Sequence, residues 1–378
     1  MEYFWQKDCR SECTEVNILF IGKRFYTNRD ALTEKYGRIY QLPYHWAKAG
    51  VDTKLWLIDY HSTEFVTQQD DSLAIISTPV KNGSVIKQYW QESRSKKKPD
   101  IIIASGDCYI GLLGYRLAKK LNAKFVFDVY DKYDEFGGYI KLLGFDLFAY
   151  LLKKSDLRMF ASQALLKQLG ILEHDFILTN GIDRKLFRNI DKSEARDKLN
   201  IHTENKIVGY FGSMEPDRGV ADLIQAIAIL RSQCIPVELL LGGKSNPELN
   251  LNQSGIHYLG NVAFSEISYA LAACDILAIP YRRSPFMDAG ASNKIAEAIA
   301  CERPIVATKS PNLYANFAKQ ALELEKYLAE PNDPNSLSLA IIEQLEDQII
   351  VSRPNNIYWE DLALNALKHI MELTSERR

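Results

Sequence analysis

The stretch IVGYFGSM, residues 207–214, decides how this chain is organised. It is an apolar run that ends in Gly212 and Ser213, which is the pattern of a buried strand followed by a tight turn. The segment GVADLIQAIAILRSQ follows, with apolar residues at the spacing of an amphipathic helix. A buried strand that leads into a helix is the repeating unit of a parallel α/β sheet. Because this unit begins at residue 207 of 378, it predicts a second α/β domain in the C-terminal half.

The same alternation of strand and helix patterns runs through the N-terminal half. VNILFIG (16–22), PDIIIAS (99–105) and KFVFDVYD (124–131) are apolar runs typical of buried strands. The segment 183–206 is polar and charged, which predicts a linker with a short helix. We therefore predict an α/β protein with two Rossmann-like, doubly wound parallel-sheet domains that face a cleft. The expected domains are residues 1–185 and 186–359, and a final helix at about 360–378 could pack back on the first domain.

Composition excludes several classes of protein. Apolar residues make up 47% of the chain and aromatic residues 11%, which is enough for two packed cores. The formal net charge of −2 gives no sign of nucleic-acid binding. The six cysteines are scattered and lack the second pair or histidine cluster of a zinc site, so no metal is expected. The start of the chain lacks a signal-peptide pattern, and no apolar run reaches the ~20 residues of a membrane span, so a cytoplasmic location is expected.

Two common nucleotide motifs are missing from the sequence. It contains neither G-x-G-x-x-G nor G-x-x-x-x-G-K-[ST], which argues against a nicotinamide enzyme and a P-loop ATPase. In open α/β sheets, ligands bind outside the carboxyl ends of the strands. Functional residues are therefore expected directly after strands.

One such position follows the strand at 207–214. A glycine after a strand lets backbone N–H groups approach a phosphate closely, and Gly212 has that place. Arg218, six residues later, would bring a charged guanidinium group to the same region. The alternative is an ordinary turn with a surface arginine.

A second position is the stretch ASNKIAEAIACERPIVATKSP, residues 291–311. Ser292 is a good cap for a helix from about 293 to 302, whose N-terminus would favour an anion. Asn293 and Glu297 are four residues apart and share a helix face. Glu297 could accept hydrogen bonds from both ribose hydroxyls of a nucleotide whose phosphates lie at the helix start. The alternative is a glutamate exposed to solvent.

The segments YFGSMEPDRGVADLIQA, ILAIPY and ASNKIAEAIACERPIVAT, in this order, resemble the C-terminal domain of GT-B glycosyltransferases of the retaining "group 1" family. The segment 99–136 and the motif ILTNGIDRKLF extend the resemblance over nearly the whole chain. It implies a nucleotide-sugar donor, a UDP- or GDP-sugar, in the C-terminal domain. It also implies a saccharide or lipid-linked acceptor in the N-terminal domain, retention of configuration, and no cofactor or metal.

The resemblance also implies roles for individual residues of the donor site. The family binds the donor diphosphate with an arginine and a lysine, and these positions are Ser213 and Arg218 here. Lys294 could supply the missing charge. In the family's Glu-x7-Glu pair, Glu297 matches the second position and Ala289 the first, with Asp288 as a possible substitute. The full donor set implied is Gly212, Ser213, Arg218, Gly243, Asp288, Ser292, Asn293, Lys294 and Glu297.

In the N-terminal domain, Tyr130 stands where the family often has a histidine, and Asp131 follows it. Asp107 could reach the acceptor or simply cap a helix. Gly37 and Arg38 match a glycine loop near the acceptor and the diphosphate, with a surface role for Arg38 as the alternative. The catalytic set expected from the resemblance is Arg218, Lys294, Asp131, Tyr130 and Asp107.

The segment 139–156 is apolar and aromatic and contains three lysines. As a basic amphipathic helix it would allow peripheral membrane contact at the inner face of the membrane, and the alternative is a buried helix with a basic end. Three other functions stay open: a nucleotide-sugar epimerase on the same scaffold, a two-lobed binding protein without activity, and a transferase that has lost activity through its changes at Ser213, Ala289 and Tyr130.

Overall fold

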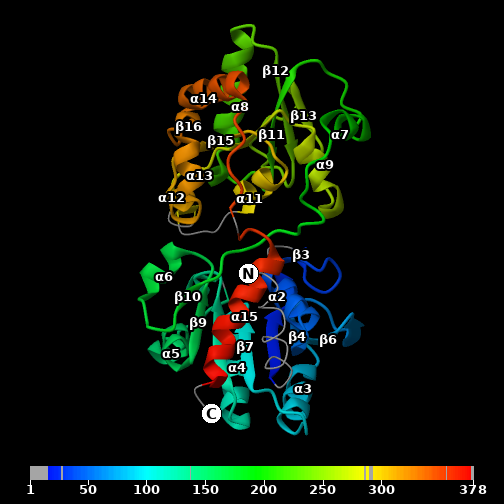
Figure 1. Cartoon of the computed structure of the whole chain (residues 1–378), viewed down its shortest axis with the longest axis vertical. Coiled ribbons are helices and arrows are strands. Elements are labelled where there is room, and N and C mark those ends of the chain that lie inside the picture. The colour runs from blue at the N-terminus through cyan, green and yellow to red at the C-terminus, as the bar shows by residue number, and fades with distance from the viewer. Residues whose placement is uncertain are drawn as a thin grey trace, which may run out of the picture. The chain divides into compact units, whose positions relative to one another are not determined.

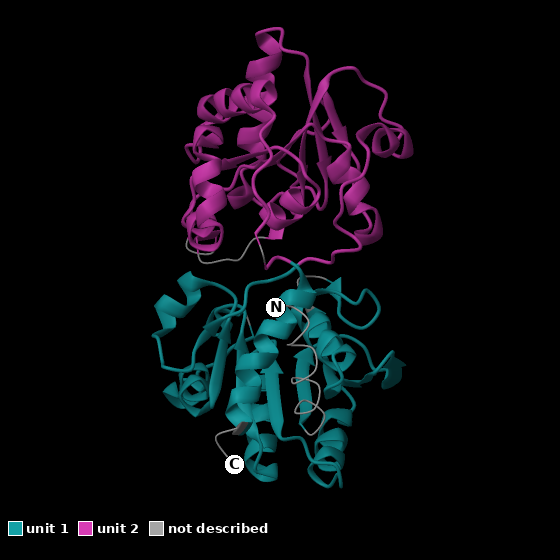
Figure 2. Cartoon of the chain, in the orientation of Figure 1, with its two compact units in different colours: residues 1–181, 358–378 teal, residues 182–357 magenta. Residues whose placement is uncertain are grey.

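The computed structural model describes residues 16–26, 29–136, 138–284, 287–288, 293–354 and 356–375. The chain divides into two compact units (Figure 2). The first comprises residues 1–181 and 358–378, and the second comprises residues 182–357. The second unit is thus one continuous segment, whereas the first is assembled from both ends of the chain.

The first unit is built on an eight-stranded sheet with strand order β10-β9-β8-β7-β1-β4-β6-β5 (Figure 1). Its strands are β1 (Asn17–Lys23), β4 (Asp52–Asp59), β5 (Val66–Asp70), β6 (Leu73–Pro79), β7 (Ile101–Ser105), β8 (Lys124–Val129), β9 (Leu157–Phe160) and β10 (Phe176–Ile177). Every pair is parallel except β5 with β6, which adds an antiparallel edge. A small hairpin, β2 (Phe25–Tyr26) with β3 (Arg29–Asp30), follows β1.

Helices cover both faces of this sheet. They are α2 (Gly37–Lys48), α3 (Ser84–Ser93), α4 (Cys108–Leu121), α5 (Leu147–Lys154), α6 (Gln163–Leu169) and α15 (Trp359–Ser375). Alternate residues of β1 enter different cores, because successive side chains of a strand point to opposite faces. Ile18 and Phe20 pack in the core that contains residues of α2 and α15, whereas Leu19 and Ile21 pack in the core that contains residues of α4 and α5.

The final helix, α15, completes the first unit. The indole N–H of Trp46 in α2 donates a hydrogen bond to the carbonyl of Ala363, at 2.7 Å. The ring of Phe176 stacks on His369 with 4.6 Å between the ring centroids. At the start and end of the second unit, the N–H of Ile182 donates to the carbonyl of Ile357, at 2.9 Å. The chain therefore enters and leaves the second unit at adjacent positions.

The second unit contains a six-stranded parallel sheet with order β13-β12-β11-β14-β15-β16. Its strands are β11 (Lys206–Phe211), β12 (Val237–Gly242), β13 (Ile256–Tyr258), β14 (Ile276–Ile279), β15 (Ile305–Thr308) and β16 (Leu328–Ala329). Its helices are α7 (Lys192–Lys198), α8 (Val220–Ser232), α9 (Ile267–Ala272), α11 (Asn293–Ala300), α12 (Pro311–Asn316), α13 (Ala318–Glu323) and α14 (Pro334–Asp347). The fold class predicted from the strand and helix patterns is confirmed in both units.

The segment 139–156 differs from the continuous helix considered for it. The α-helix within it is α5 alone, which begins after Asp146, and the Asp146 carboxylate caps this helix by accepting from the N–H of Ala149, at 3.0 Å. Residues Leu142–Gly144 form a single 3₁₀ turn in which Leu143 has a left-handed φ of 51°. The apolar residues before α5 are therefore presented by a loop.

Candidate functional site

The strand order of each sheet reverses at one point. In the first sheet the chain passes outward from β1 to β4 and β6, and then returns to the other side of β1 with β7. In the second it passes outward from β11 to β12 and β13, and then returns beside β11 with β14. In sheets of this kind, the loops that follow the two central strands diverge at the reversal point and leave a crevice, which is where ligands bind. Most of the residues predicted for function lie near these two positions.

The turns after β11 and β12 each require a glycine. Gly212 has a φ of +150°, and a Cβ there would lie 2.6 Å from the ammonium nitrogen of Lys294. Gly243, after β12, has a φ of +122°, and a Cβ there would lie 2.1 Å from the carbonyl oxygen of Gly212. The Lys294 side chain, carried by α11, therefore lies directly on the backbone of Gly212. The structure brings these three predicted donor residues together.

Two tyrosines support the cations at this crevice. The guanidinium of Arg218 lies 5.4 Å from the ring centroid of Tyr281, and the ammonium of Lys294 lies 5.8 Å from that of Tyr210. The hydroxyl of Tyr210 donates to the carbonyl of Ser213 at 2.7 Å, and burial raises the pKa of Tyr210 well above its ordinary value. Because Tyr210 stays neutral, its ring gives Lys294 an aromatic surface without an opposing charge. Sequence reasoning did not single out Tyr210 or Tyr281, although both lie in the motifs that it used.

The loops after β11 and β14 are fixed against each other. Gly219 has a φ of +67°, and a Cβ there would lie 1.7 Å from the carbonyl oxygen of Pro280. The N–H of Arg282 donates to the carbonyl of Asp217, at 2.9 Å. The guanidinium of Arg282 also makes two hydrogen bonds to Asp222, at 2.7 and 2.6 Å. The Arg218 side chain is thus presented from a rigid pair of loops.

Helix α11 presents one polar face. Ile295 and Ile299 are buried, whereas Asn293, Lys294 and Glu297 are partly exposed, as the predicted helix register requires. Asn293 and Glu297 are one turn apart, roughly 6 Å along the axis. Burial, followed by the nearby charge of Glu297, raises the pKa of the Cys301 thiol to about 12.

Two of the predicted donor residues have a different status. The carboxylate of Asp288 accepts three hydrogen bonds from Arg283, at 2.8 to 3.0 Å, so its charge is locally balanced. Ser292, the predicted cap of α11, lies outside the described residues, as does Ala289.

At the first crevice, Asp107 caps α4. Its carboxylate accepts from the N–H groups of Tyr109 and Ile110, each at 2.9 Å, which is the role considered as the alternative. Burial and the adjacent carboxylate of Asp107 also raise the pKa of Tyr60, with which Asp107 shares a hydrogen bond. Only 9% of the surface of Asp107 is exposed, so little of this residue is available to contact a ligand.

Tyr130 and Asp131 follow β8 at the same edge. The hydroxyl of Tyr130 donates to the carbonyl of Gly106, at 3.2 Å. Burial raises the pKa of Asp131, whose carboxylate accepts from the N–H of Lys132 at 2.8 Å. A carboxyl group with a raised pKa near the ends of β7 and β8 is suited to exchanging a proton with a hydroxyl.

Arg38 does not have the position that the family resemblance implies. Its side chain is fully buried, and it donates to both carboxylate oxygens of Asp128, at 2.9 and 2.6 Å. It also donates to the carbonyl of Leu178 and to the side chain of Asn180, each at 3.1 Å. The buried Arg38 side chain therefore connects α2 to β8 and to the segment after β10. In this position it is not accessible to a diphosphate. Gly37, with a φ of +71°, starts α2.

Three further residues gather at the first crevice. The ammonium of Lys23, the last residue of β1, lies 5.4 Å from the ring centroid of Tyr60 and 5.7 Å from that of Phe136. Sequence reasoning missed all three, since a single lysine after a strand carries no distinctive signal.

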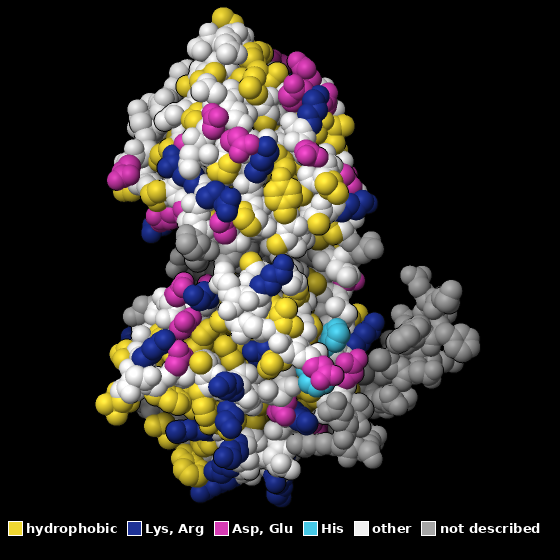
Figure 3. Space-filling view, turned by 90° about the vertical axis from the view of Figure 1, so that its left-hand side faces the viewer, with side chains coloured by type: hydrophobic (Ala, Val, Ile, Leu, Met, Phe, Trp, Pro, Cys, Tyr) yellow, Lys and Arg dark blue, Asp and Glu magenta, His cyan; other side chains and the backbone are white. Residues whose placement is uncertain are grey.

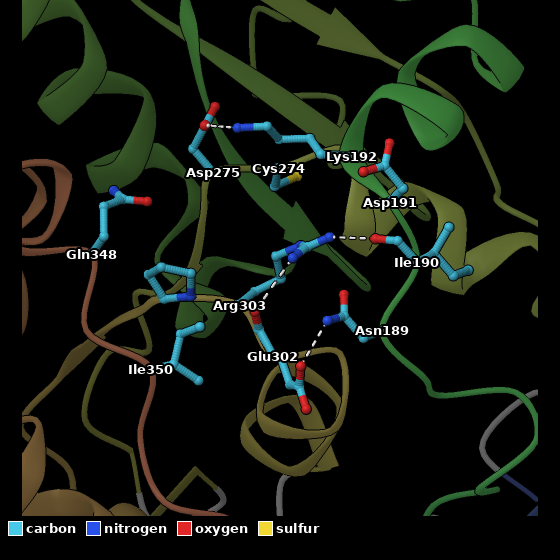
Figure 4. Close-up of a pocket in the computed structure, with 11 residues that line it drawn as sticks. Asn189, Ile190, Asp191, Lys192, Cys274, Asp275, Glu302, Arg303, Gln348 and Ile350 are labelled. Atoms are coloured by element: carbon cyan, nitrogen blue, oxygen red, sulfur yellow. Dashed lines mark hydrogen bonds and ion pairs between the residues drawn. The ribbon is translucent and has the colours of Figure 1, made fainter.

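A cavity of about 370 Å³ lies at the opposite edge of the second sheet (Figure 4). Its lining includes Asp275 and Pro304, which directly precede β14 and β15. The polar groups around it bind one another: Lys192 donates to Asp275 at 2.6 Å, and Arg303 donates to the carbonyl of Ile190 at 2.7 Å. Burial alone would raise the pKa of Asp275, but the hydrogen bond from Lys192 holds this pKa below its ordinary value. The cavity contains none of the residues predicted for donor binding.

The described residues show neither a metal site nor a membrane-spanning helix. No group of His, Cys, Asp or Glu in these parts of the chain is arranged to hold a metal ion. Among the same residues, no helix combines the length and apolar character that crossing a membrane requires.

Comparison of the sequence with known proteins identifies similar enzymes. Residues 205–347 match the family model described as "Glycosyl transferases group 1". Over 183 residues, the chain is 27% identical to the GDP-mannose-dependent monoacylated alpha-(1-6)-phosphatidylinositol monomannoside mannosyltransferase of Corynebacterium glutamicum, an alignment that covers 46% of this chain and 47% of that protein. Over 157 residues, it is 27% identical to the D-inositol 3-phosphate glycosyltransferase of Segniliparus rotundus, covering 38% of this chain and 34% of that protein. The matches thus span less than half the length of these curated relatives.

Solved structures resemble the chain over nearly its whole length. Sucrose-phosphate synthase from Thermosynechococcus elongatus superposes with a TM-score of 0.70 and 17% identity, covering 96% of this chain and all of that one. HepE of Anabaena, in complex with UDP and glucose, superposes with a TM-score of 0.64 and 19% identity, also covering 96% of this chain and all of that one. At these identities the likeness shows the fold, which is that of two Rossmann-like units in one chain.

Proposed function

We propose that the protein transfers a sugar from a nucleotide-sugar donor to an acceptor hydroxyl, because residues 205–347 match the group 1 glycosyl transferase model and the chain has the GT-B fold. The donor is a UDP- or GDP-sugar bound by the second unit. The acceptor is a saccharide or lipid-linked saccharide bound by the first unit. The reaction needs no cofactor or metal and retains the anomeric configuration.

One observation carries the proposal. Two cationic side chains from separate segments, Arg218 and Lys294, gather at the crevice where the order of the second sheet reverses, and Lys294 lies on Gly212 itself. A diphosphate bound there would meet two positive charges and the open backbone of a glycine turn. Glu297, one helical turn beyond Asn293, would then receive the ribose hydroxyls.

The chemistry follows from this charge distribution. As the glycosidic bond breaks, negative charge grows on the departing nucleoside diphosphate, and fixed cations stabilise that charge. The acceptor hydroxyl attacks from the side on which the diphosphate leaves, and the diphosphate takes the hydroxyl proton. At the first unit, Asp131 and Tyr130 would orient the acceptor. Asp107 would support them chiefly by capping α4.

The relatives support the substrate class. HepE was solved with UDP and glucose, and the mannosyltransferase of Corynebacterium glutamicum is named as dependent on GDP-mannose. HepE has also been solved with UDP-glucose, so a nucleoside diphosphate sugar is the ligand named for both proteins, which agrees with the cations Arg218 and Lys294 near Gly212.

A thermal-shift screen of the full chain with UDP, GDP and ADP and their sugar conjugates tests the proposal. We expect one nucleotide and its sugar conjugates to raise the melting temperature. At concentrations above the dissociation constant, this stabilisation should grow with the logarithm of the ligand concentration. That donor should then lose its sugar to an acceptor in a mixture of candidate saccharides and lipid-linked saccharides. Conversion of the donor without any acceptor would instead indicate an epimerase. Stabilisation by none of the nucleotides would refute donor binding.

We also propose peripheral membrane contact through the loop before α5. Four apolar side chains there are largely exposed: Ile140, Leu142, Leu143 and Phe145, at 69%, 72%, 100% and 53%. The exposed Lys153 and Lys154 follow at the end of α5. Hydrophobic and basic side chains also lie together on the side of the first unit that carries α5 and α6 (Figure 3). Exposed apolar side chains beside lysines fit the interface of an anionic bilayer.

Replacing both Leu142 and Leu143 with aspartate should release the protein from membranes. Burying each leucine in lipid is worth about 2 kcal/mol, so the double variant should bind anionic vesicles at least roughly 100-fold more weakly. Sedimentation with phosphatidylglycerol vesicles at low salt measures the effect. Leu339→Asp, at a position 63% exposed in the second unit, is the matched control and should bind as the unaltered protein does. Equal sedimentation of all three proteins would remove the membrane contact.

A further inference from the structure

The crevice of the first unit contains a cation that the proposed mechanism does not yet use. Lys23 is the last residue of β1, and Gly106 follows β7, the strand on the other side of the reversal point. A Cβ added to Gly106 would lie 2.7 Å from the Cβ of Lys23, so the two segments are in direct contact. Lys23 therefore lies at the position in this sheet where a ligand is expected.

The surroundings of Lys23 leave its charge unmatched. Its partly buried ammonium faces the rings of Tyr60 and Phe136, and within the described part of the chain no carboxylate lies at ion-pair distance from it. Its basic neighbours are used differently. Arg24 is paired with Asp30 and Asp59, and Lys132 is paired with Glu135.

The carboxylate of Asp107, which neighbours Tyr60, is committed to other groups. Asp107 accepts from two N–H groups at the start of α4, and it shares a hydrogen bond with Tyr60. Tyr60 thus connects the carboxylate to the aromatic surface under Lys23 without bringing the carboxylate to the ammonium. A cation gains far less from aromatic rings than a partly desolvated ammonium gains from an anion. A compact ammonium held in this way is suited to a phosphate group, which it binds as a point charge.

We propose that Lys23 binds a phosphate group of the acceptor, so that this transferase acts on an anionic acceptor. The phosphate belongs either to a soluble phosphorylated polyol or to a lipid headgroup, since the chemistry at Lys23 is the same. The inference rests on the proposed function, because it assigns the first unit to the acceptor. The phosphates of the donor have their own cations, Arg218 and Lys294, in the second unit.

Binding of paired probes to the full chain, in the presence of saturating UDP or GDP, tests the soluble source. The pairs are glucose 6-phosphate with glucose and glycerol 3-phosphate with glycerol, measured by titration calorimetry. We expect the phosphorylated member of at least one pair to bind at least roughly tenfold more tightly, the factor that about 1.4 kcal/mol gives. Lys23→Met should abolish this preference and Lys23→Arg should retain part of it. Lys81→Met, which removes a lysine that donates to the carbonyl of His61, should retain all of it.

Vesicles of phosphatidylcholine with and without phosphatidic acid test the lipid source. If the phosphate is that of a headgroup, the gain in binding on adding phosphatidic acid should be smaller for Lys23→Met than for Lys81→Met. A phosphate preference that survives Lys23→Met, or no preference in either kind of experiment, would overturn the inference. Thermal stabilisation by the nucleotide should be unchanged in Lys23→Met, so failure of this inference can be distinguished from failure of donor binding.

Discussion

Arg218→Ala should lower the rate of sugar transfer by roughly 100- to 1000-fold, while the dissociation constant for the nucleotide sugar rises much less. The guanidinium lies over the ring of Tyr281 at the crevice after β11, and loops joined through Gly219 and Arg282 hold it there. A fixed cation gains most when the charge opposite it increases, and the diphosphate gains charge only as the glycosidic bond breaks. Single-turnover transfer and separate donor titrations measure the two quantities.

The control for this variant is Arg231→Ala in the same unit. Arg231 lies at the end of α8 and donates to the carbonyl of Val237, which begins β12 at the opposite edge of the sheet. Transfer by Arg231→Ala should stay within about twofold of the unaltered protein, since surface changes away from the site have small effects. Arg218→Lys keeps the charge and should recover part of the rate. Equal losses of donor affinity and of turnover in Arg218→Ala would show that the residue only anchors the donor.

Glu297→Ala should weaken binding of the nucleotide sugar by roughly 30-fold with the fold intact. Hydrogen bonds to a charged group contribute about 1.5–3 kcal/mol, and the proposed carboxylate accepts them from the ribose. Glu297 is partly exposed on a helix whose core contacts come from Ile295 and Ile299, so its removal leaves the packing unchanged. Glu346→Ala, at an exposed position near the end of α14, is the control and should bind the donor normally.

A ligand that lacks one ribose hydroxyl makes the Glu297 test specific. The unaltered protein should bind the 2′-deoxy form of the nucleotide more weakly than the ribose form. Glu297→Ala should bind both forms equally, because the group that distinguishes them is gone. A full preference for ribose in Glu297→Ala would refute the assigned contact, whatever the change in overall affinity.

Much of the fold could be predicted because its central strands are unusually regular. Runs such as Ile101–Ser105 are buried on both faces, as expected for a strand of a parallel sheet that is covered by helices on both sides. The face of α11 that carries Glu297 was predicted for a similar reason, since isoleucines four residues apart define the buried side of a helix.

The parts that were missed lack such local signals. The edge pair of β5 and β6 did not stand out, since β5 reads VTQQD and is mostly exposed. Arg38 shows the limit for functional residues. Its position in the sequence fits a loop that contacts phosphate, but Asp128, 90 residues away, draws its side chain inside. Lys23 and Tyr60 come together only because β1 and β4 are neighbours in the sheet. Sequence spacing alone does not reveal such pairings.

The hydrogen bond between Ile182 and Ile357 has a practical consequence. Since these residues are adjacent, the intervening segment can be excised and a short glycine-containing turn can close the remainder, which keeps α15 joined to the α/β unit that it completes. Such a shortened protein would isolate one half of the proposed two-substrate enzyme. Its partner fragment, expressed separately, would provide the other half for reconstitution.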